Sequence, residues 1–255
     1  MLPKNIQLFT HGVELEQDSI GMSPAKVVKI TRKNELFYLK YISKIFSNTT
    51  FSVKREAELM AFLKSKIAVP DLVMYEENDQ YECMIVQSVE GELLYEISSP
   101  QLYVELLAEA FTMLKTIDPR ECTFQSDIDF RLHELKYLIE SNLIAIEDFN
   151  EEGLDFATPQ DLVNFLENTK PSEEIVFSHG DLGDSNIIVV NRKIKGIIDW
   201  GRGGKADKWV DISFGVSNIL DKYDNQEYVE RYFKLIDEDP SFEKIKYHQL
   251  VDVLF

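Results

Sequence analysis

Apolar and polar residues alternate over residues 25–30 and again over 36–41, the pattern of two antiparallel strands that each bury one face. The polar residues Arg32, Lys33 and Asn34 stand between the two segments and predict a tight turn. A second pair of short strands is predicted at 72–75 and 82–86. The early part of the chain therefore reads as β-rich.

One helix is predicted between the two strand pairs. Apolar residues recur at helical spacing from Val53 to Ile67, and Pro70 closes the segment. We expect residues 1–86 to form an N-terminal lobe and residues 87–91 to form a hinge. Residues 92–255 would then form the C-terminal lobe.

The C-terminal lobe is predicted to be mainly helical. A single β segment is expected within it, with strands at 186–190 and 194–198 and a turn at Asn191-Arg192-Lys193. Apolar residues follow the helical period in the remaining segments, which are 102–117, 132–146, 162–166, 227–236 and 242–255. The fold class is therefore α+β, with a β-rich lobe followed by a helical one.

The composition narrows the class of protein. The chain has 255 residues, of which 44% are apolar, enough for two folded lobes. Met1–Thr10 has no basic segment followed by an apolar run, and no stretch of about 18 apolar residues occurs, so we expect neither a signal peptide nor a membrane span. Cys83 and Cys122 lie in no CxxC motif, which favours reduced cysteines in a cytoplasmic protein without zinc.

The strongest chemical signal is the stretch Ser178–Asn186, followed by Asp199. An Asp, an Asn five residues later and a second Asp after a short hairpin are the groups that phosphoryl transfer requires. Asp181 would orient an attacking hydroxyl and accept its proton. Asn186 and Asp199, at the two ends of the hairpin, would hold Mg²⁺ on the nucleotide phosphates. Each residue alone would be unremarkable in a turn, but the set predicts a kinase.

A second signal pairs Lys40, on a predicted strand, with Glu56, sixteen residues later on the predicted helix. Alone, they would be read as a solvated strand residue and a helix-surface charge. With Asp181, Asn186 and Asp199 downstream in the expected order, they predict the phosphate-binding Lys and supporting Glu of a kinase. The turn Gly21-Met22-Ser23-Pro24 stands where a kinase places a loop over the phosphates, although it is not a GxGxxG motif.

The net charge of −18 bears on the second substrate. A field of this sign repels nucleic acid and anionic membranes and attracts cations, although an acidic surface can also serve solubility alone. ATP is itself anionic, so local Lys residues, backbone N–H groups and Mg²⁺ would have to neutralise its phosphates. The charge therefore favours a cationic acceptor.

Several stretches resemble the aminoglycoside 3'-phosphotransferases, in particular the type III enzyme of Gram-positive bacteria. The likeness covers the chain after about residue 12 and is carried by four segments: Gly21–Val27, Val176–Asn186, Ala206–Trp209 and Lys244–Tyr247. The resemblance implies a bilobal protein-kinase-like fold. It also implies an ATP- and Mg²⁺-dependent enzyme, with GTP as a possible donor, that acts as a monomer or weak dimer in antibiotic resistance.

The resemblance also implies roles in nucleotide binding and catalysis. Tyr38 would stack on adenine, and the backbone from Gln87 to Val89 would hydrogen-bond it. Ser23 would contact the β-phosphate, beside Lys40 and Glu56. Asp211 would brace the loop that carries the catalytic Asp181.

For the antibiotic, the resemblance implies a set of carboxylates that would surround the ammonium groups. Its members, besides Asp181, are Asp148, Glu151, Asp184, Asp221, Asp252 and the terminal carboxylate of Phe255. Asp148 and Glu151 lie in the acidic run 147–152, which would otherwise be read as a solvated loop.

Two departures from the relatives concern the same site. The chain ends Asp-Val-Leu-Phe where the relatives end Asp-Glu-Leu-Phe, so Val253 stands in place of a carboxylate. Ser217 stands where the relatives carry Arg. Loss of a charge-assisted hydrogen bond costs about 1.5–3 kcal/mol at a desolvated site, so we expect a narrower or shifted drug spectrum.

Three alternative functions remain open at this stage. A kinase for another hydroxylated cation, such as choline, would use the same acidic residues. A non-catalytic pseudokinase would be expected to lose Lys40, Asp181, Asn186 or Asp199, and all four are present. A protein kinase is disfavoured because the chain has no HRD, DFG or APE sequence and no activation loop after Asp199.

Overall fold

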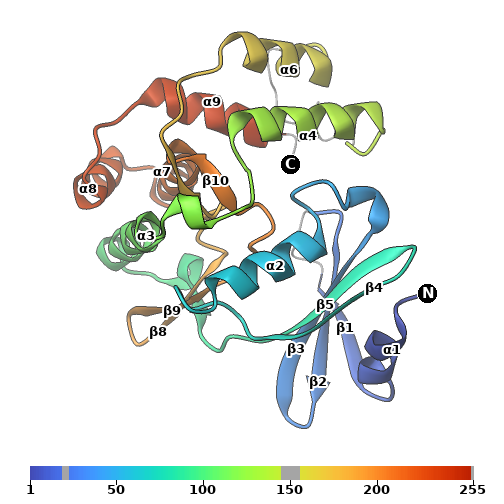
Figure 1. Cartoon of the computed structure of the whole chain (residues 1–255). Helices are drawn as coiled ribbons and strands as arrows, with labels where there is room; N and C mark the ends of the chain where they lie inside the picture. The colour runs from blue at the N-terminus through green and yellow to red at the C-terminus, as the bar shows by residue number, and fades with distance from the viewer. Residues whose placement is uncertain (19–22, 145–155, 254–255) are drawn as a thin grey trace. The chain divides into compact units, whose positions relative to one another are not determined.

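The structure is a computed structural model that describes residues 1–18, 23–144 and 156–253. The chain divides into two compact units, each built from two segments (Figure 1). Unit 1 comprises Met1–Glu96 and Ser185–Gly203, and unit 2 comprises Ile97–Asp184 and Gly204–Phe255. Residues 185–203 were expected in the C-terminal lobe but group with unit 1, and the hinge expected at 87–91 stays a prediction.

A five-stranded antiparallel sheet forms the centre of unit 1, with the strand order β1-β2-β3-β5-β4. Both predicted strand pairs are confirmed, and each strand is slightly longer than expected. The bounds are β1 (Glu14–Asp18), β2 (Lys26–Arg32), β3 (Glu35–Ser43), β4 (Leu72–Glu77) and β5 (Tyr81–Gln87).

Strand β3 shows why the sheet forms in this register. Phe37 and Leu39 are buried, whereas Tyr38 and Lys40 point to the opposite face, as the alternation of a strand requires. The β2–β3 turn consists of Lys33 and Asn34, which both have positive φ, 52° and 65°. Two such residues form the turn type that matches the twist of an antiparallel hairpin.

Two helices, α2 and α1, accompany this sheet. Helix α2 (Val53–Leu63) starts at Ser52, whose side chain accepts the Arg55 N–H, and it ends four residues before the predicted Ile67. It packs against β3, β4 and β5. Helix α1 (Lys4–Thr10) and strand β1 were not predicted; α1 buries Ile6 completely in the core beneath the sheet.

A smaller sheet in unit 1 has the order β6-β8-β9 and contains the hairpin predicted from the sequence. Its strands are β6 (Glu92–Leu93), β8 (Ile187–Val190) and β9 (Lys193–Ile197). Asn191 and Arg192 form the turn, with positive φ at both residues. Strand β6 pairs with β8, and the Ile197 N–H donates to the Ala68 carbonyl, which explains why residues 185–203 group with unit 1.

Unit 2 is mainly helical, as predicted. Its helices are α3 (Pro100–Lys115), α4 (Ile128–Glu140), α6 (Pro159–Asn168), α7 (Trp209–Tyr223), α8 (Gln226–Ile236) and α9 (Phe242–Asp252). The short 3-10 helices of the two units are η1 (Lys44–Phe46), η2 (Leu94–Glu96) and η3 (Pro119–Glu121). None of the helices in the described ranges has the length and apolar character needed to span a bilayer.

Two expectations for this region were wrong. Helix α4 begins four residues before the predicted 132, because the Asp127 side chain accepts the Phe130 N–H and starts the helix. A single β segment was expected after the hinge, but β7 (Ile175–Ser178) and β10 (Gly204–Asp207) form a second antiparallel pair. Four residues are too few to show a clear alternation of apolar and polar positions.

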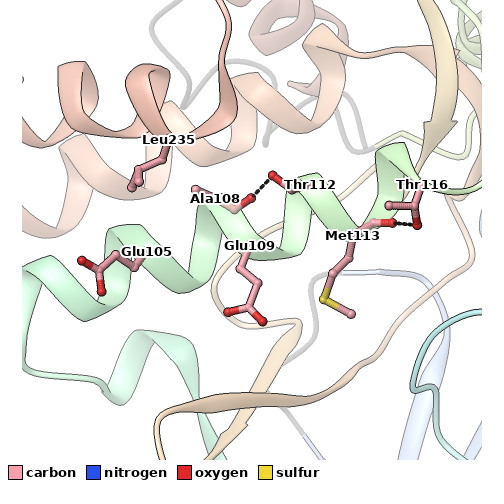
Figure 2. A pocket seen from close by; sticks show the side chains of 7 residues that line it. All are labelled: Glu105, Ala108, Glu109, Thr112, Met113, Thr116 and Leu235. Atoms are coloured by element: carbon pink, nitrogen blue, oxygen red, sulfur yellow. Dashed lines mark hydrogen bonds between the residues drawn. The ribbon is translucent and has the colours of Figure 1, made fainter.

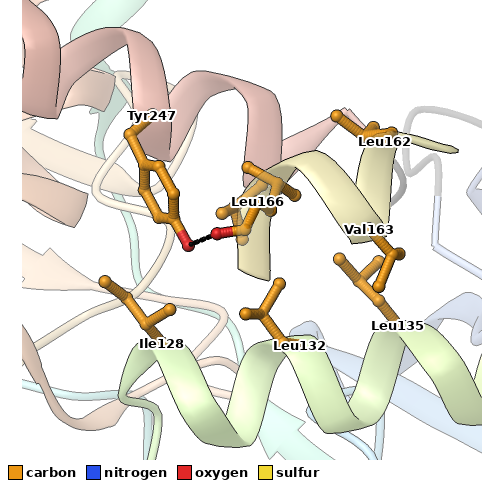
Figure 3. Packing of buried hydrophobic residues seen from close by; sticks show 8 residues of the cluster. Ile128, Leu132, Leu135, Leu162, Val163, Leu166 and Tyr247 are labelled. Atoms are coloured by element: carbon orange, nitrogen blue, oxygen red, sulfur yellow. Dashed lines mark hydrogen bonds between the residues drawn. The ribbon is translucent and has the colours of Figure 1, made fainter. Parts of the chain in front are cut away.

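One hydrophobic cluster joins α4, α6 and α9 (Figure 3). The Tyr247 hydroxyl, within the cluster, donates to the Leu166 carbonyl at 3.1 Å. The buried members are Ile128, Leu132, Leu135, Leu162, Val163, Leu166, Tyr247 and Val251. This packing fixes α9 along its length and so positions Asp252, its last residue.

Candidate active site

Lys40 lies at the centre of a charged cluster in unit 1. Its ammonium Nζ is 2.7 Å from Glu56 Oε2 on α2 and 2.7 Å from Asp199 Oδ1 after β9. The side chains of Lys40 and Glu56 are only 13% and 5% exposed, whereas that of Asp199 is 47% exposed. The structure thus brings together three of the residues that the sequence singled out.

Burial and the neighbouring charges together shift the pKa values of Lys40 and Glu56. Burial alone would lower the pKa of Lys40, but the carboxylates of Asp199 and Glu56 outweigh it and hold that pKa above its ordinary value. Burial raises the pKa of the Glu56 carboxyl, although the Lys40 ammonium works in the opposite direction. With all three groups charged, one cation faces two anions, and the local excess of negative charge suits a divalent cation.

Helix α2 is tied to residues 200–203 by contacts that the sequence did not reveal. Arg55 donates to the Gly201 carbonyl at 2.9 Å and to the Gly203 carbonyl at 2.7 Å. A Cβ at Gly201 would lie 2.6 Å from the Thr50 carbonyl oxygen, so only glycine permits this approach. Arg55 and Gly201 therefore hold α2, and with it Glu56, against the segment that carries Asp199.

Asn186 and Asp199 flank the β8–β9 hairpin. The Ile198 N–H donates to the Asn186 carbonyl at 2.9 Å, so the two predicted metal ligands lie on adjacent chain segments. Asp199 has a φ of 61°, a left-handed conformation that Asp tolerates better than most residues and that is frequent at functional sites.

The chemistry of this donor pair fits Mg²⁺. Both side chains offer hard oxygen atoms, and Mg²⁺ in nucleotide sites binds one or two protein ligands and completes its shell with phosphate oxygens and water. No group of three His, Cys, Asp or Glu side chains able to form a protein-only metal site occurs in the described ranges. Both cysteines, Cys83 and Cys122, are free and buried.

The residues predicted to contact adenine also lie in unit 1. Tyr38 is half-buried and pairs with Val86 in the β3–β5 register, one residue before Gln87. The N–H groups of Gln87 and Ser88 donate to the carbonyls of Asp71 and Leu36 at 2.9 Å each. A base would therefore have to use other backbone groups of the segment that ends at Val89.

Ser23 is half-buried and precedes β2 by two residues. Gly21 and Met22, in the same predicted phosphate loop, lie outside the described residues. The proposed contact of Ser23 with a phosphate stays a prediction.

The loop that carries Asp181 belongs to unit 2. Its backbone is clamped by Asp211, whose two carboxylate oxygens accept the N–H groups of His179 and Gly180 at 3.0 Å each. The Asp181 N–H in turn donates to Nδ1 of His179 at 3.2 Å. The expected bracing of this loop by Asp211 is confirmed.

Asp211 is buried in the first turn of α7, where the helix dipole favours a negative charge. Burial raises the pKa of its carboxyl, and the electrostatic interaction with His179 and the hydrogen bonds from the loop oppose this rise. Removal of this carboxylate would take an acceptor from two buried N–H groups, of which that of Gly180 also donates to Ser178 Oγ at 3.0 Å.

The described carboxylates predicted to bind the antibiotic all lie in unit 2. Asp184 is half-buried at the end of the Asp181 loop, and its N–H donates to Asn218 Oδ1 on α7 at 2.7 Å. Asp221 is exposed on α7, and Asp252 is half-buried at the end of α9, which packs against α7. Asp148, Glu151 and Phe255 lie outside the described residues.

Ser217, one of the two departures noted in the sequence, has a hydrogen-bond partner on α9. Its hydroxyl accepts a hydrogen bond from Gln249 Nε2 at 2.8 Å, which links α7 to α9. Asp221 lies one turn further along α7, and Asp252 lies one turn further along α9. The Ser217–Gln249 bond thus joins the helices that carry two predicted ligands.

A pocket of about 350 Å³ lies elsewhere in unit 2, between α3 and α8 (Figure 2). The hydroxyls of Thr112 and Thr116 in its wall donate back to the Ala108 and Met113 carbonyls, at 2.8 and 2.7 Å. The wall is therefore mostly apolar, and none of the predicted site residues lines it.

Comparisons with known proteins agree with this arrangement. Residues 14–243 match the model of the phosphotransferase enzyme family, APH. The chain is 42% identical to aminoglycoside 3'-phosphotransferases of Enterococcus faecalis and Staphylococcus aureus, each over 244 residues that cover 94% of this chain and 92% of the relative.

Solved structures show the same fold. An aminoglycoside 3'-phosphotransferase of type VIII superposes with a TM-score of 0.85 at 22% identity, covering 98% of this chain and 97% of that one. An aminoglycoside phosphotransferase from Streptomyces rimosus, solved with ADP and streptomycin, has a TM-score of 0.80 at 17% identity, covering 98% and 95%. The expected α+β, protein-kinase-like fold is confirmed, and the chain belongs to the phosphotransferase enzyme family, within which it is similar to aminoglycoside 3'-phosphotransferases.

Proposed function

We propose that the protein transfers the γ-phosphoryl group of ATP to the 3'-hydroxyl of a kanamycin- or neomycin-type aminoglycoside and so confers antibiotic resistance. The observation that carries the proposal is the position of Lys40, 2.7 Å from both Glu56 and Asp199. This ion-pair cluster occurs in a chain 42% identical to proteins named aminoglycoside 3'-phosphotransferases.

On the nucleotide side, Lys40 would bind the phosphates while Glu56 holds its ammonium in place. Asn186 and Asp199 would bind Mg²⁺, which when present neutralises the charge that develops on the phosphates. Tyr38 would stack on adenine, backbone groups between Gln87 and Val89 would hydrogen-bond it, and Ser23 would reach the β-phosphate. GTP remains a possible donor for the same site.

On the acceptor side, Asp181 would orient the attacking hydroxyl and take its proton. Transfer would be direct and in line, without a phosphoenzyme, so catalysis would rest on positioning and charge neutralisation. Asp184, Asp221 and Asp252 would bind ammonium groups, with Asp148, Glu151 and the terminal carboxylate of Phe255 as further candidates. The net charge of −18 supports a polycationic substrate.

The proposed reaction also bears on the cellular location and the partners of the protein. A cytoplasmic location would give access to ATP, and reduced cysteines are consistent with it. We further propose that the protein works as a monomer or weak dimer and binds neither nucleic acid nor membranes, because its negative charge repels both.

The direct test is an ADP-release assay with purified protein, Mg-ATP and kanamycin, neomycin, amikacin or choline. We expect turnover with at least one aminoglycoside, phosphate on its 3'-oxygen by ³¹P NMR, and little turnover with choline. The Asp181→Ala protein serves as the background control. Release of ADP with choline but with no aminoglycoside would instead support the kinase for another cation.

A further inference from the structure

Tyr103 and Asp184 form a hydrogen-bonded pair inside unit 2. The Tyr103 hydroxyl, on α3, donates to Asp184 Oδ2 at 2.6 Å. Tyr103 is fully buried, whereas Asp184 is only half-buried, so the pair connects the core to the surface. A hydrogen bond from a hydroxyl to a carboxylate is shorter and stronger than one between neutral groups.

Asp184 is therefore held at two points. Tyr103 fixes its side chain, and Asn218 on α7 accepts its backbone N–H at 2.7 Å. The second carboxylate oxygen, Oδ1, has no hydrogen-bond donor among the described residues. One oxygen is thus committed to the fold while the other can accept a ligand's N–H.

Tyr103 is itself locked by its neighbours. The ring of Tyr223 packs edge-on against it, with ring centroids 5.3 Å apart and an angle of 83° between the planes. The Lys222 ammonium lies over the Tyr103 ring, 5.3 Å from its centroid. Burial, with the hydrogen bond to Asp184, raises the pKa of Tyr103, so its hydroxyl remains a proton donor at physiological pH.

We propose that Tyr103 is a positioning residue that orients Asp184 toward an ammonium group of the acceptor substrate. The inference rests on the proposed function, because it takes the bound cation to be an aminoglycoside amine. A carboxylate already fixed in its binding rotamer loses less conformational entropy when it binds, so the pair raises affinity without taking part in the chemical step.

Tyr223, at the end of α7, offers a matched control beside Tyr103. Tyr223 belongs to the same aromatic pair, but its buried hydroxyl has no hydrogen-bond partner in the described ranges. Tyr103→Phe and Tyr223→Phe each remove one buried hydroxyl and keep the ring. Only the first removes a bond to Asp184, so a general loss of packing would affect both variants alike.

The test is a double-mutant cycle of Tyr103→Phe and Asp184→Asn, with kcat and KM measured for kanamycin and for ATP. We expect Tyr103→Phe to raise the kanamycin KM about tenfold, in line with the loss of a hydrogen bond to a charged group, and to leave kcat and the ATP KM within about twofold. Tyr223→Phe should change the kanamycin KM less than about twofold. In the Asp184→Asn background, Tyr103→Phe should have little further effect.

An unchanged kanamycin KM in a folded Tyr103→Phe protein would overturn the positioning role. The role would also be overturned if Tyr103→Phe raised the kanamycin KM by the same factor in the wild-type and Asp184→Asn backgrounds. If Tyr103→Phe does not fold, Asn218→Ala tests the second anchor of Asp184, and an unchanged KM there contradicts the inference. If the wild-type protein turns over no aminoglycoside, the proposed function fails together with the positioning role. If it does turn over an aminoglycoside and only the variants behave otherwise than expected, the positioning role alone fails.

Discussion

The two charged regions of this protein differ in how their carboxylates are held. In unit 1, Glu56 is buried and shares the Lys40 ammonium with Asp199. In unit 2, Asp184 is half-buried with a tyrosine as its partner, and Asp221 is exposed on a helix surface. The first region is a coupled ion-pair network, whereas the second is a set of separately anchored charges.

This difference suits two kinds of ligand. A nucleotide triphosphate presents the same phosphates in every reaction cycle, and a rigid buried network can hold them and the metal in one geometry. Aminoglycosides differ in the number and placement of their amines, and separate carboxylates near the surface can accept several of them. We therefore expect large, coupled mutational effects in unit 1 and smaller, graded ones among the carboxylates of unit 2.

The largest effect should come from Asp181, which we propose takes part in the chemical step itself. Asp181→Ala should lower kcat by roughly 10²–10⁴-fold, the usual range for loss of a positioned proton acceptor, and leave ATP affinity nearly unchanged. Steady-state kinetics and nucleotide titration measure the two quantities. Asp184→Asn, three residues away in the same loop, is the control and should alter KM instead; substantial activity in Asp181→Ala would contradict the role.

The next effect tests the coupling in unit 1. Lys40→Met leaves the buried Glu56 without its cation, and breaking a buried pair in this way costs about 3–5 kcal/mol of unfolding free energy. Glu56→Gln should cost less, because Lys40 keeps Asp199 as a partner. Urea denaturation of both variants and of the double variant measures the difference. Equal and additive losses would show that the network is not coupled.

A smaller effect is expected when single carboxylates of unit 2 are replaced, and its size should differ between them. Asp184→Asn should raise the aminoglycoside KM about tenfold or more, because this carboxylate is partly desolvated and preoriented. Asp221→Asn should raise it only severalfold, since an exposed charge is screened by solvent. KM values for one aminoglycoside at saturating ATP test the order, and a larger effect at Asp221 would reverse our assignment.

The smallest effect should be the response to salt. Raising the ionic strength from about 0.05 to 0.5 M shortens the screening length severalfold, so the aminoglycoside KM should rise. The rise in KM should be weaker in Asp221→Asn than in the wild type, because the exposed charge of Asp221 contributes most to the part of the binding free energy that salt screens. An identical salt response in the two proteins would indicate that Asp221 does not face the substrate.

The sequence predicted those parts of the fold and site that depend on local pattern. The alternation in β3 placed Tyr38 and Lys40 on one face, and the order of Lys40, Glu56, Asp181, Asn186 and Asp199 indicated a kinase before any geometry was known. The ion pair of Lys40 with Glu56 and the bracing by Asp211 were both expected and are observed.

The remaining features depend on contacts between distant segments. Tyr103 meets Asp184 across 81 positions, and Arg55 meets Gly201 across 146, so no local pattern reveals either pair. Helix α1 has seven residues and only one is buried, which is too weak a periodic signal. Helix α7 could have been found, because Trp209, Ile212, Val216 and Ile219 recur at helical spacing.

The central claim is that the Lys40 cluster of unit 1 is a Mg²⁺-dependent nucleotide site. The most direct test is calorimetric titration of a non-hydrolysable ATP analogue into wild type and Asp199→Ala, each with and without Mg²⁺. We predict that Mg²⁺ strengthens binding at least tenfold in the wild type and has little effect in Asp199→Ala, which loses one of two proposed ligands. The same Mg²⁺-dependent gain in both proteins would contradict the assignment.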